Sequence, residues 1–254
     1  MKFDDLDKKM RVFETHDDKC ILPEMYMVAR IDGRNFTKLT KEKHAFEKPF
    51  DPRFHEYMIE TVRHLMTCGF NIVYGYTQSD EISLLFHLHE NAFSRKERKY
   101  NSILAAEASA RFSMQLGDIG TFDCRICQLP NSSLVSDYFR WRHEDAHRNS
   151  LSAHCYWLLR SLSHTAVEAT ERINKLSTSD KNELLFAHGI NFNDLPSWQK
   201  RGSGIYWKEV TTEGFNPVKQ ETVLVQRRVL SVDKELPVGL AYNEFVQQFM
   251  EGGN

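Results

Sequence analysis

MYMVARIDGRNF, residues Met25–Phe36, is an apolar run that ends abruptly at Asp32-Gly33. A second stretch, Tyr74–Phe86, reads YGYTQSDEISLLF, in which Ser79-Asp80-Glu81 joins two apolar runs. Short apolar runs bounded by turn residues predict buried strands. A carboxylate that follows one buried strand and faces a carboxylate pair in a hairpin turn is typical of a divalent-metal centre for phosphoryl transfer. These two stretches therefore predict both the fold and a site.

The flanking sequence predicts a β-α-β-β-α-β order for the first half of the chain. Asp51-Pro52 is a typical helix start, because proline fits the first helical turn, and an apolar stripe follows it to near Gly69. The order is the split βαβ arrangement. The expected elements are a helix over 3–13, a strand over 25–31 that Asp32-Gly33 ends, a helix over 51–69, strands over 71–78 and 82–88, a helix over 95–116 and a strand over 122–129.

Right-handed crossovers fix the order of these strands in a sheet. They place the third strand between the first two and antiparallel to both. The end of the first strand then lies beside the start of the third. Asp32 is therefore expected next to Asp80 and Glu81, although these residues are far apart in the sequence.

The second half of the chain has a different character, so we place a boundary near Asn131. Its expected elements are helices over 132–160 and 164–176, a helix cap at 179–183, and strand-like runs at 205–210 and 222–229. We predict an α+β protein with a catalytic domain over 1–131 and a C-terminal domain over 132–254 that is mainly helical and contains a small β element.

Composition indicates an ordinary soluble globular protein, since 41% of the 254 residues are hydrophobic and 27% are charged. The net charge of −2 means that a nucleic-acid partner would need a local basic patch. The N-terminus lacks the apolar segment of a secretory signal, and no apolar run approaches the roughly 20 residues needed to span a bilayer. Five cysteines, an odd number, suggest a reducing compartment. We expect a cytoplasmic protein.

Two features favour a polyphosphate substrate. Gly33 lacks a Cβ, so the backbone there can approach a metal or a phosphate closely. The residues expected to open the helix over 95–116 form a basic cluster, which is unfavourable beside the helix dipole and suggests an anion partner, either a triphosphate or an RNA backbone. The alternative interpretation is that these basic residues only form a solvated helix face. The cluster comprises Arg95, Lys96, Arg98 and Lys99, and further positive charge follows the Asp-Gly turn at Lys38, Lys41, Lys43 and Lys48.

Histidines and large aromatic residues gather in the region over 132–160. His143, His147 and His154 share one helical face, and we interpret them as a polar surface that contacts RNA rather than as metal ligands. Tyr156 and Trp157 are interpreted as core or subunit-interface residues rather than as platforms for bases.

Five segments together resemble the tRNA-His guanylyltransferase superfamily, whose members are reverse-direction (3′→5′) nucleotide-adding polymerases. The resemblance implies a fold similar to the palm of ordinary polymerases, which agrees with the split βαβ order. It also implies two Mg²⁺ ions, tRNA and nucleoside triphosphates such as ATP and GTP as partners, and a homotetramer. The segments are FDDLDKKMRVFE, RIDGRNFTKL, FEKPFD, YGYTQSDEISLLF and DKNELLFAHGINFNDLP, and they span nearly the whole chain.

The resemblance also assigns residues. It implies that Asp32, Asp80 and the Gly33 carbonyl are metal ligands, and that Glu81 supports the metal pair as a third catalytic residue. Lys181, in the DKNE segment, is a candidate contact to a substrate phosphate. Around the nucleoside triphosphate the resemblance places Gly33, Arg34, Asn35, Phe36, Ser79 and Asp80, with Lys48, Arg95 and Lys99 at the phosphates.

One segment departs from the family pattern. Members dedicated to tRNA-His carry a motif close to His-Ile-Asn-Asn-Leu-Tyr-Asn, whereas residues 147–153 read HRNSLSA here. The departure favours the guanylyltransferase-like branch, which repairs 5′-truncated tRNAs by templated addition after ATP or GTP activates the RNA end. One alternative is a tRNA-His-specific guanylyltransferase. Others are a non-catalytic RNA-binding protein and a palm-type nucleotide cyclase, although the chain has Ser-Asp-Glu in place of a Gly-Gly-Asp/Glu-Glu-Phe hairpin.

Overall fold

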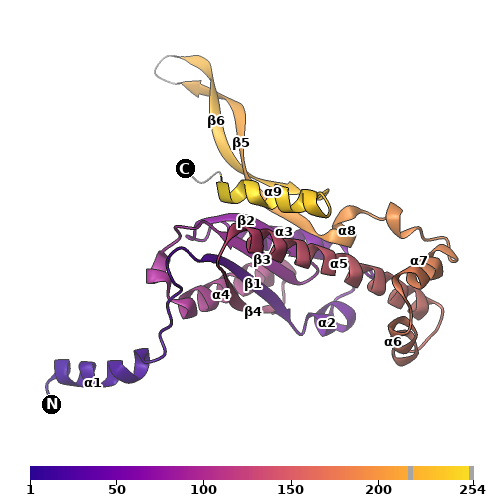
Figure 1. Cartoon of the computed structure of the whole chain (residues 1–254), viewed down its shortest axis with the longest axis horizontal. Coiled ribbons are helices and arrows are strands. Elements are labelled where there is room, and N and C mark those ends of the chain that lie inside the picture. Colours follow the sequence, from indigo (N-terminus) through magenta and orange to yellow (C-terminus); the bar gives the residue numbers. More distant parts are fainter. Residues whose placement is uncertain (217–219, 252–254) are drawn as a thin grey trace.

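A six-stranded antiparallel sheet forms the centre of the molecule (Figure 1). The computed structural model describes residues 1–216 and 220–251, so residues 217–219 and 252–254 of the predicted C-terminal domain lie outside the described residues. The order across the sheet is β4-β1-β3-β2-β5-β6, and β3 lies between β1 and β2 and antiparallel to both, as predicted. The strands are β1 (Tyr26–Arg34), β2 (Ile72–Gln78), β3 (Glu81–Phe86), β4 (Thr121–Leu129), β5 (Ser203–Asn216) and β6 (Glu221–Asp233).

β1 extends further than the sequence predicts. The strand continues through Asp32-Gly33 to Arg34, because β4 pairs with β1 along its whole length and holds Arg34 opposite Thr121. The pairing with β3, by contrast, stops where Asp32 lies opposite Glu81. Asp32-Gly33 therefore marks the point where the pairing with β3 ends. Pairing with β4 keeps β1 extended beyond it.

Alternation along β1 separates two cores, one on each face of the sheet. Met27, Ala29 and Ile31 belong to the core beneath α3 (Pro52–Leu65) and α4 (Glu97–Leu116). Val28 belongs to the opposite core, beneath α5 (Ser132–Ser161) and α9 (Leu240–Glu251). Since successive side chains of a strand point to opposite faces, Arg30 and Asp32 share the α5 face with Val28.

The second half of the chain completes the sheet begun by the first half. Residues 203–206 of β5 pair with residues 74–77 of β2, and β5 and β6 then project from the body as a long hairpin (Figure 1). A third core joins the C-terminal part of α5 to α6 (Ala166–Asn174) and α7 (Thr178–Phe186). Ser177 caps α7, so the cap predicted at 179–183 lies inside the helix.

The remaining helices are short, apart from the one at the N-terminus. They are α1 (Phe3–Thr15), α2 (Phe36–Lys38) and α8 (Ser197–Arg201), with a π-helical turn at Leu39–Lys43 and 3₁₀ turns at Ala92–Arg95 and Phe192–Asp194. In the part of the chain that the structure describes, no helix is long and apolar enough to cross a membrane.

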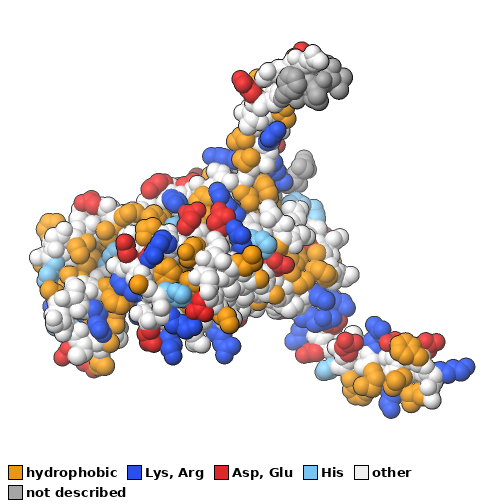
Figure 2. All heavy atoms as spheres, turned by 180° about the vertical axis from the view of Figure 1, so that it is seen from behind, with side chains coloured by type: hydrophobic (Ala, Val, Ile, Leu, Met, Phe, Trp, Pro, Cys, Tyr) orange, Lys and Arg blue, Asp and Glu red, His pale blue; other side chains and the backbone are white. Residues whose placement is uncertain are grey.

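α1 projects from the body and buries none of its side chains (Figures 1 and 2). Figure 2 shows hydrophobic side chains gathered on this projecting helix. The large hydrophobic residues exposed on it are Phe3, Leu6, Met10, Val12 and Phe13. The homotetramer and the cytoplasmic location stay predictions.

The basic cluster predicted to open the long helix is arranged differently. α4 begins at Glu97, an acidic residue that suits the positive end of the helix dipole, so Arg95 and Lys96 precede the helix. Lys96 and Arg98 both form ion pairs with Asp18. Glu97 and the ion pairs with Asp18 therefore offset much of the dipole mismatch that suggested an anion partner.

Asp51 is the buried N-cap of α3 and yields a prediction about stability. Its carboxylate accepts hydrogen bonds from the backbone N–H groups of Glu47, Arg53 and Phe54. Burial raises the pKa of Asp51, but hydrogen bonds from the Arg53 side chain and these N–H groups outweigh it and lower the pKa to about 2. We expect Asp51→Ala to reduce the free energy of unfolding by about 2 kcal/mol at pH 7.

A depressed pKa in the folded state stabilises the fold above the unfolded-state pKa, and this contribution is lost as pH falls toward 2. The difference between wild type and Asp51→Ala should therefore shrink between pH 4 and pH 2 in urea unfolding. Asn131→Ala is the matched control, since Asn131 is the exposed N-cap of α5 and accepts one bond from Leu134 N. Its cost should be about 1 kcal/mol and independent of pH. A pH-independent cost at Asp51 would contradict the assignment.

Candidate active site

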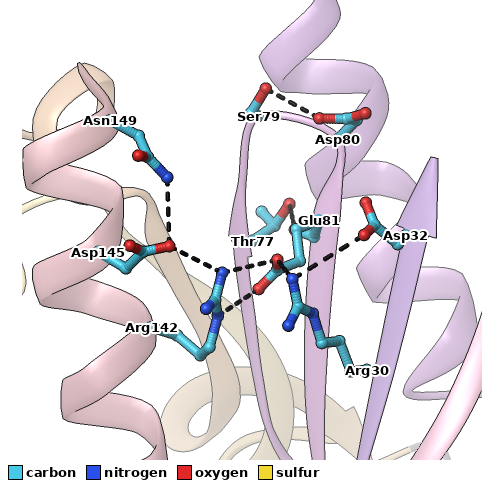
Figure 3. Close-up of polar contacts among 9 residues, drawn as sticks. All are labelled: Arg30, Asp32, Thr77, Ser79, Asp80, Glu81, Arg142, Asp145 and Asn149. Atoms are coloured by element: carbon cyan, nitrogen blue, oxygen red, sulfur yellow. Dashed lines mark hydrogen bonds and ion pairs between the residues drawn. The ribbon is translucent and has the colours of Figure 1, made fainter. Parts of the chain in front are cut away.

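The sheet places Asp32, Asp80 and Glu81 at one end of the β1–β3 pair (Figure 3). Asp32 lies opposite Glu81 in the ladder, and the backbone N–H of Gly33 donates to the Asp80 carbonyl at 3.0 Å. Ser79 and Asp80 form the tight turn between β2 and β3, in which Ser79 has a φ of 53°. The predicted juxtaposition of these carboxylates is confirmed.

Gly33 is required by close packing rather than by an unusual backbone angle. A Cβ at this position would lie 2.6 Å from Cγ of Phe36 and 2.9 Å from Cβ of Asp80. Real Cβ atoms do not approach other atoms so closely, so any side chain would have to displace both the Phe36 ring and Asp80. The glycine therefore sets the distance between the two carboxylate-bearing segments.

Asp80 has the electrostatic surroundings of a cation ligand. Burial, together with the negative charges of Asp32 and Glu81, outweighs the hydrogen bonds that lower the pKa of its carboxyl group and raises that pKa to about 6. The hydroxyl of Ser79 donates to Asp80 Oδ1 at 3.1 Å. The cation nearest to Asp32 is Arg30, whose Nη2 lies 3.9 Å from Asp32 Oδ2. Crowded carboxylates such as Asp32 and Asp80 fit a divalent metal ion, which prefers oxygen ligands.

Glu81 has cationic partners of its own. Arg142 Nε and Nη2 lie 2.6 and 2.8 Å from its two carboxylate oxygens, and Arg30 Nη2 lies 2.5 Å from Oε2. Among the described residues no group of three or more His, Cys, Asp or Glu side chains is arranged to hold a metal. Asp32, Asp80 and the Gly33 carbonyl therefore stay the predicted ligands, with Glu81 bound instead to two arginines.

The three carboxylates line a cavity of about 490 Å³. One of its walls is a single face of α5, since the lining residues recur every three or four positions. Small side chains alternate there with long polar and aromatic ones. The lining residues from α5 are Arg142, Ala146, Asn149, Ser152, Ala153, Tyr156 and Trp157.

Lysines and aromatic rings meet across this cavity. Lys41 Nζ lies 4.9 Å from the ring centre of Tyr156 and 5.5 Å from that of Trp157. Lys48 Nζ lies 5.6 Å from Trp157 and lines an adjoining smaller cavity that shares Ser79. Tyr156 packs against the third core, in line with the predicted core role, but Tyr156 and Trp157 also line this cavity. Aromatic faces beside ammonium groups suit a nucleobase next to phosphates.

The residues predicted around the triphosphate differ in their surroundings. Phe36 is buried, with its ring centre 4.8 Å from that of Phe122, and also lines the 490 Å³ cavity. Asn35 has a φ of 60°, and Arg34 is exposed. Lys48 donates to the Thr40 carbonyl, and burial together with nearby Lys41 lowers its pKa.

Arg95 and Lys99 do not line the cavity that contains Asp32. Arg95 is 7% exposed and donates to backbone carbonyls, at 2.7 Å to Met25 and 2.8 Å to Glu90. Lys99 Nζ lies 5.8 Å from the ring centre of Phe93. The guanidinium of Arg95 thus ties together chain segments, and these contacts do not support the predicted role at a triphosphate.

A further cavity of about 290 Å³ lies along α5 and α7. His147, Asn149 and Lys181 line it, and Lys181 Nζ lies 3.1 Å from Ser152 Oγ. The prediction that His143 and His154 form a polar surface is wrong, because both are buried. Burial lowers the pKa of His143 to about 3, so this ring is neutral.

Arg30 and Arg142 are the site residues that the sequence does not reveal. Arg142 is 61 residues from Glu81 in the sequence, and a charged residue within a histidine-rich helix predicts no particular partner. The helical spacing between Arg142 and residues 147–153 is the signal that could have placed Arg142 on the same face of α5 as residues of that segment.

Comparisons with known proteins agree with this geometry. A family model described as "tRNAHis guanylyltransferase" matches residues 7–130, and one described as "Thg1 C terminal domain" matches residues 133–245. The probable tRNA(His) guanylyltransferase of Mus musculus is 32% identical over 212 residues, covering 79% of this chain and 70% of that protein. The tRNA(His) guanylyltransferase of Schizosaccharomyces pombe is 33% identical over 236 residues, covering 89% of each.

A solved structure supports the same relationship. The structure of a bacterial tRNA(His) guanylyltransferase-like protein in complex with ATP matches with a TM-score of 0.75 and 28% identity, covering 97% of this chain and 99% of that one. The two family models together span almost the whole chain. The chain belongs to the tRNAHis guanylyltransferase family, which consists of nucleotidyltransferases.

Proposed function

We propose that this protein adds nucleotides in the 3′→5′ direction to the 5′ end of tRNA, and that it repairs 5′-truncated tRNAs by templated addition. The observation that carries the proposal is the pair Asp32 and Asp80 on the wall of a cavity that also presents Lys41, Tyr156 and Trp157. Family membership supports addition to a tRNA 5′ end. The bacterial relative was solved with ATP and with GTP, which supports these nucleotides as substrates.

Two Mg²⁺ ions fit the donor set that this chain offers. Asp32, Asp80 and the Gly33 carbonyl would hold them, since carboxylate and carbonyl oxygens suit Mg²⁺. When bound, such ions lower the pKa of an attacking hydroxyl and neutralise a leaving pyrophosphate. Ser79 orients the Asp80 carboxylate through its hydroxyl, and Gly33 keeps Asp80 close to β1.

The other cavity residues would bind and orient the nucleotide. Tyr156 and Trp157 present ring faces to a base, while Lys41 and Lys48 lie within reach of its phosphates. In the proposed reaction, a 5′-phosphate oxygen of the RNA attacks the α-phosphorus of ATP or GTP and releases pyrophosphate. The 3′-hydroxyl of an incoming nucleotide then attacks the activated 5′-phosphorus and expels the activating nucleoside monophosphate.

Repair of truncated tRNA is supported by the departure at residues 147–153. Ser150 and Leu151 of this segment are buried. His147, Asn149 and Ser152 line the 290 Å³ cavity. The alternative is strict guanylyl addition to tRNA-His. The names of the relatives from Mus musculus and Schizosaccharomyces pombe favour that alternative.

Asp32→Asn and Asp80→Asn should each reduce nucleotide addition by roughly a thousandfold or more, because each removes a charged ligand from the proposed metal pair. The assay follows label from ATP or GTP into the 5′ end of a 5′-monophosphorylated tRNA. Asp17→Asn is the control, since Asp17 is exposed and lies outside the cavity. If either cavity variant retains a tenth of wild-type activity with Mg²⁺ as the only metal, the assignment is wrong.

Lys48→Ala should raise the KM for the nucleoside triphosphate about tenfold, since a charge-assisted phosphate contact contributes roughly 1.5–3 kcal/mol. Lys99→Ala removes the same charge far from the carboxylate cavity and should leave KM unchanged. Steady-state kinetics with varied nucleotide decides between them. A larger effect at Lys99 would restore the role that the resemblance implies for it and remove Lys48 from the site.

The preferred tRNA substrate distinguishes repair of truncated tRNAs from strict guanylylation of tRNA-His. We expect kcat/KM on 5′-truncated tRNAs with a template base opposite the vacant position to exceed that on full-length tRNA-His. The measurement uses several truncated tRNAs with different anticodons and the nucleotide complementary to each template base. A strong preference for the His anticodon, independent of pairing at the acceptor end, would favour the alternative function.

A further inference from the structure

A chain of polar contacts runs from α5 to the carboxylates (Figure 3). Arg142 Nε lies 2.6 Å from Glu81 Oε1, and Arg142 Nη2 lies 2.8 Å from Glu81 Oε2. Arg142 Nη2 also lies 3.2 Å from Asp145 Oδ2. Asn149 Nδ2 donates to the same Asp145 oxygen at 3.2 Å. Glu81 is thus held from α5 by a guanidinium that is itself held by neighbours on its own helix.

These contacts occupy most of the bonding capacity of Glu81. A carboxylate offers about four lone-pair sites, and Arg142 takes two of them in the bidentate geometry that gives strong, directional pairing. Arg30 takes another. The side chains of Arg142 and Glu81 are only 9% and 15% exposed, so water screens this pairing little.

A Glu81 carboxylate without these partners would be a third anionic ligand beside Asp32 and Asp80. It follows Asp80 directly in the chain and lies opposite Asp32 in the ladder. Such a ligand would attract a cation more strongly and draw it away from the position that Asp32 and Asp80 share. Neutralising Glu81 with guanidinium groups keeps the negative charge where the proposed chemistry needs it.

We propose that Arg142 is a positioning residue for nucleotide transfer, which binds Glu81 and so keeps it from competing with Asp32 and Asp80 for the metal. The inference rests on the proposed function and assigns a role to a residue outside the metal ligands. Asp145 holds the rotamer of Arg142, and Asn149 in turn holds Asp145. Asn149 lines both the 490 Å³ and the 290 Å³ cavities, so this support stands in the wall between them.

A direct contact between Arg142 and substrate is the competing role. Arg142 lines the carboxylate cavity, and its Nη1 takes part in none of the contacts described above. A substrate contact through Nη1 would act on nucleotide or RNA binding and would leave metal affinity unchanged. A purely structural role would act on stability and weaken all binding together.

The experiment measures Mn²⁺ affinity by electron paramagnetic resonance without RNA or nucleotide, together with nucleotide-addition kinetics and the melting temperature. The variants are Arg142→Met, Arg142→Lys and the double variant Arg142→Met/Glu81→Gln. Arg142→Met removes the charge but keeps much of the side-chain volume. Arg142→Lys keeps the charge but cannot form the bidentate pair. Because Arg142→Lys is the milder change, Mn²⁺ affinity and kinetics can still be measured on it if Arg142→Met does not fold.

We expect Arg142→Met to bind Mn²⁺ several-fold more tightly, because one positive charge is removed beside the site and Glu81 keeps only Arg30 as a cationic partner. Its kcat should fall about tenfold or more with little change in the KM for the nucleotide. Arg142→Lys should shift both quantities in the same directions by less. The double variant should return Mn²⁺ affinity to the wild-type value, because the Glu81→Gln change leaves an uncharged amide in place of the carboxylate.

Three results would overturn the inference. Unchanged Mn²⁺ affinity and kcat in Arg142→Met and Arg142→Lys show that Glu81 needs no neutralisation. A rise in KM alone assigns Arg142 to substrate binding. Loss of Mn²⁺ affinity in parallel with the melting temperature, in both single variants, assigns it to stability. Asp80→Asn identifies failure of the proposed function itself: if it leaves wild-type Mn²⁺ affinity unchanged, the metal does not bind at these carboxylates at all.

Discussion

The antiparallel register between β1 and β3 places Asp32 opposite Glu81 and next to Asp80, and the site depends on it. A shift of one residue would turn Asp32 to the opposite face of the sheet, into the core beneath α3 and α4. The register is held from both sides, since Met27 and Ile31 fill one core while Val28 fills the other. The same apolar alternation that stabilises the sheet therefore orients the carboxylate.

Bringing three carboxylates together costs free energy because their negative charges repel one another. The surroundings of Glu81 and Asp80 differ in how far they offset this repulsion. Glu81 receives two guanidinium groups, which satisfy it within the folded protein. Asp80 receives a hydroxyl from Ser79, and burial raises its pKa to about 6. A group whose charged form is disfavoured by its surroundings is stabilised when a cation arrives. Glu81, which is paired with arginines, is therefore a structural carboxylate, whereas the adjacent Asp80 is suited to binding a metal ion.

Local signals explain why much of the fold could be predicted from the sequence. The cap at Asp51 and the strand order follow from short-range chemistry and from the handedness of crossovers. Partners of the basic residues could not be predicted, because a guanidinium can pair with a phosphate, a carboxylate or a carbonyl. Arg95 binds backbone carbonyls, and Arg142 binds a glutamate 61 residues away. Only the packed structure decides among such partners.

The wall of the cavity shows how the second half of the chain contributes to a site whose carboxylates come from the first. Ala146 and Ala153 leave space on one face of α5, while Arg142, Asn149 and Tyr156 project from the same face. A helix fixes these side chains relative to one another at about 1.5 Å per residue, so the arginine that holds Glu81 and the ring beside Lys41 keep a constant separation. Sequence predicts that residues 132–160 are helical, but the choice of face depends on β1 and β3, which lie beneath it. The two halves therefore form one site only when the sheet and α5 pack together.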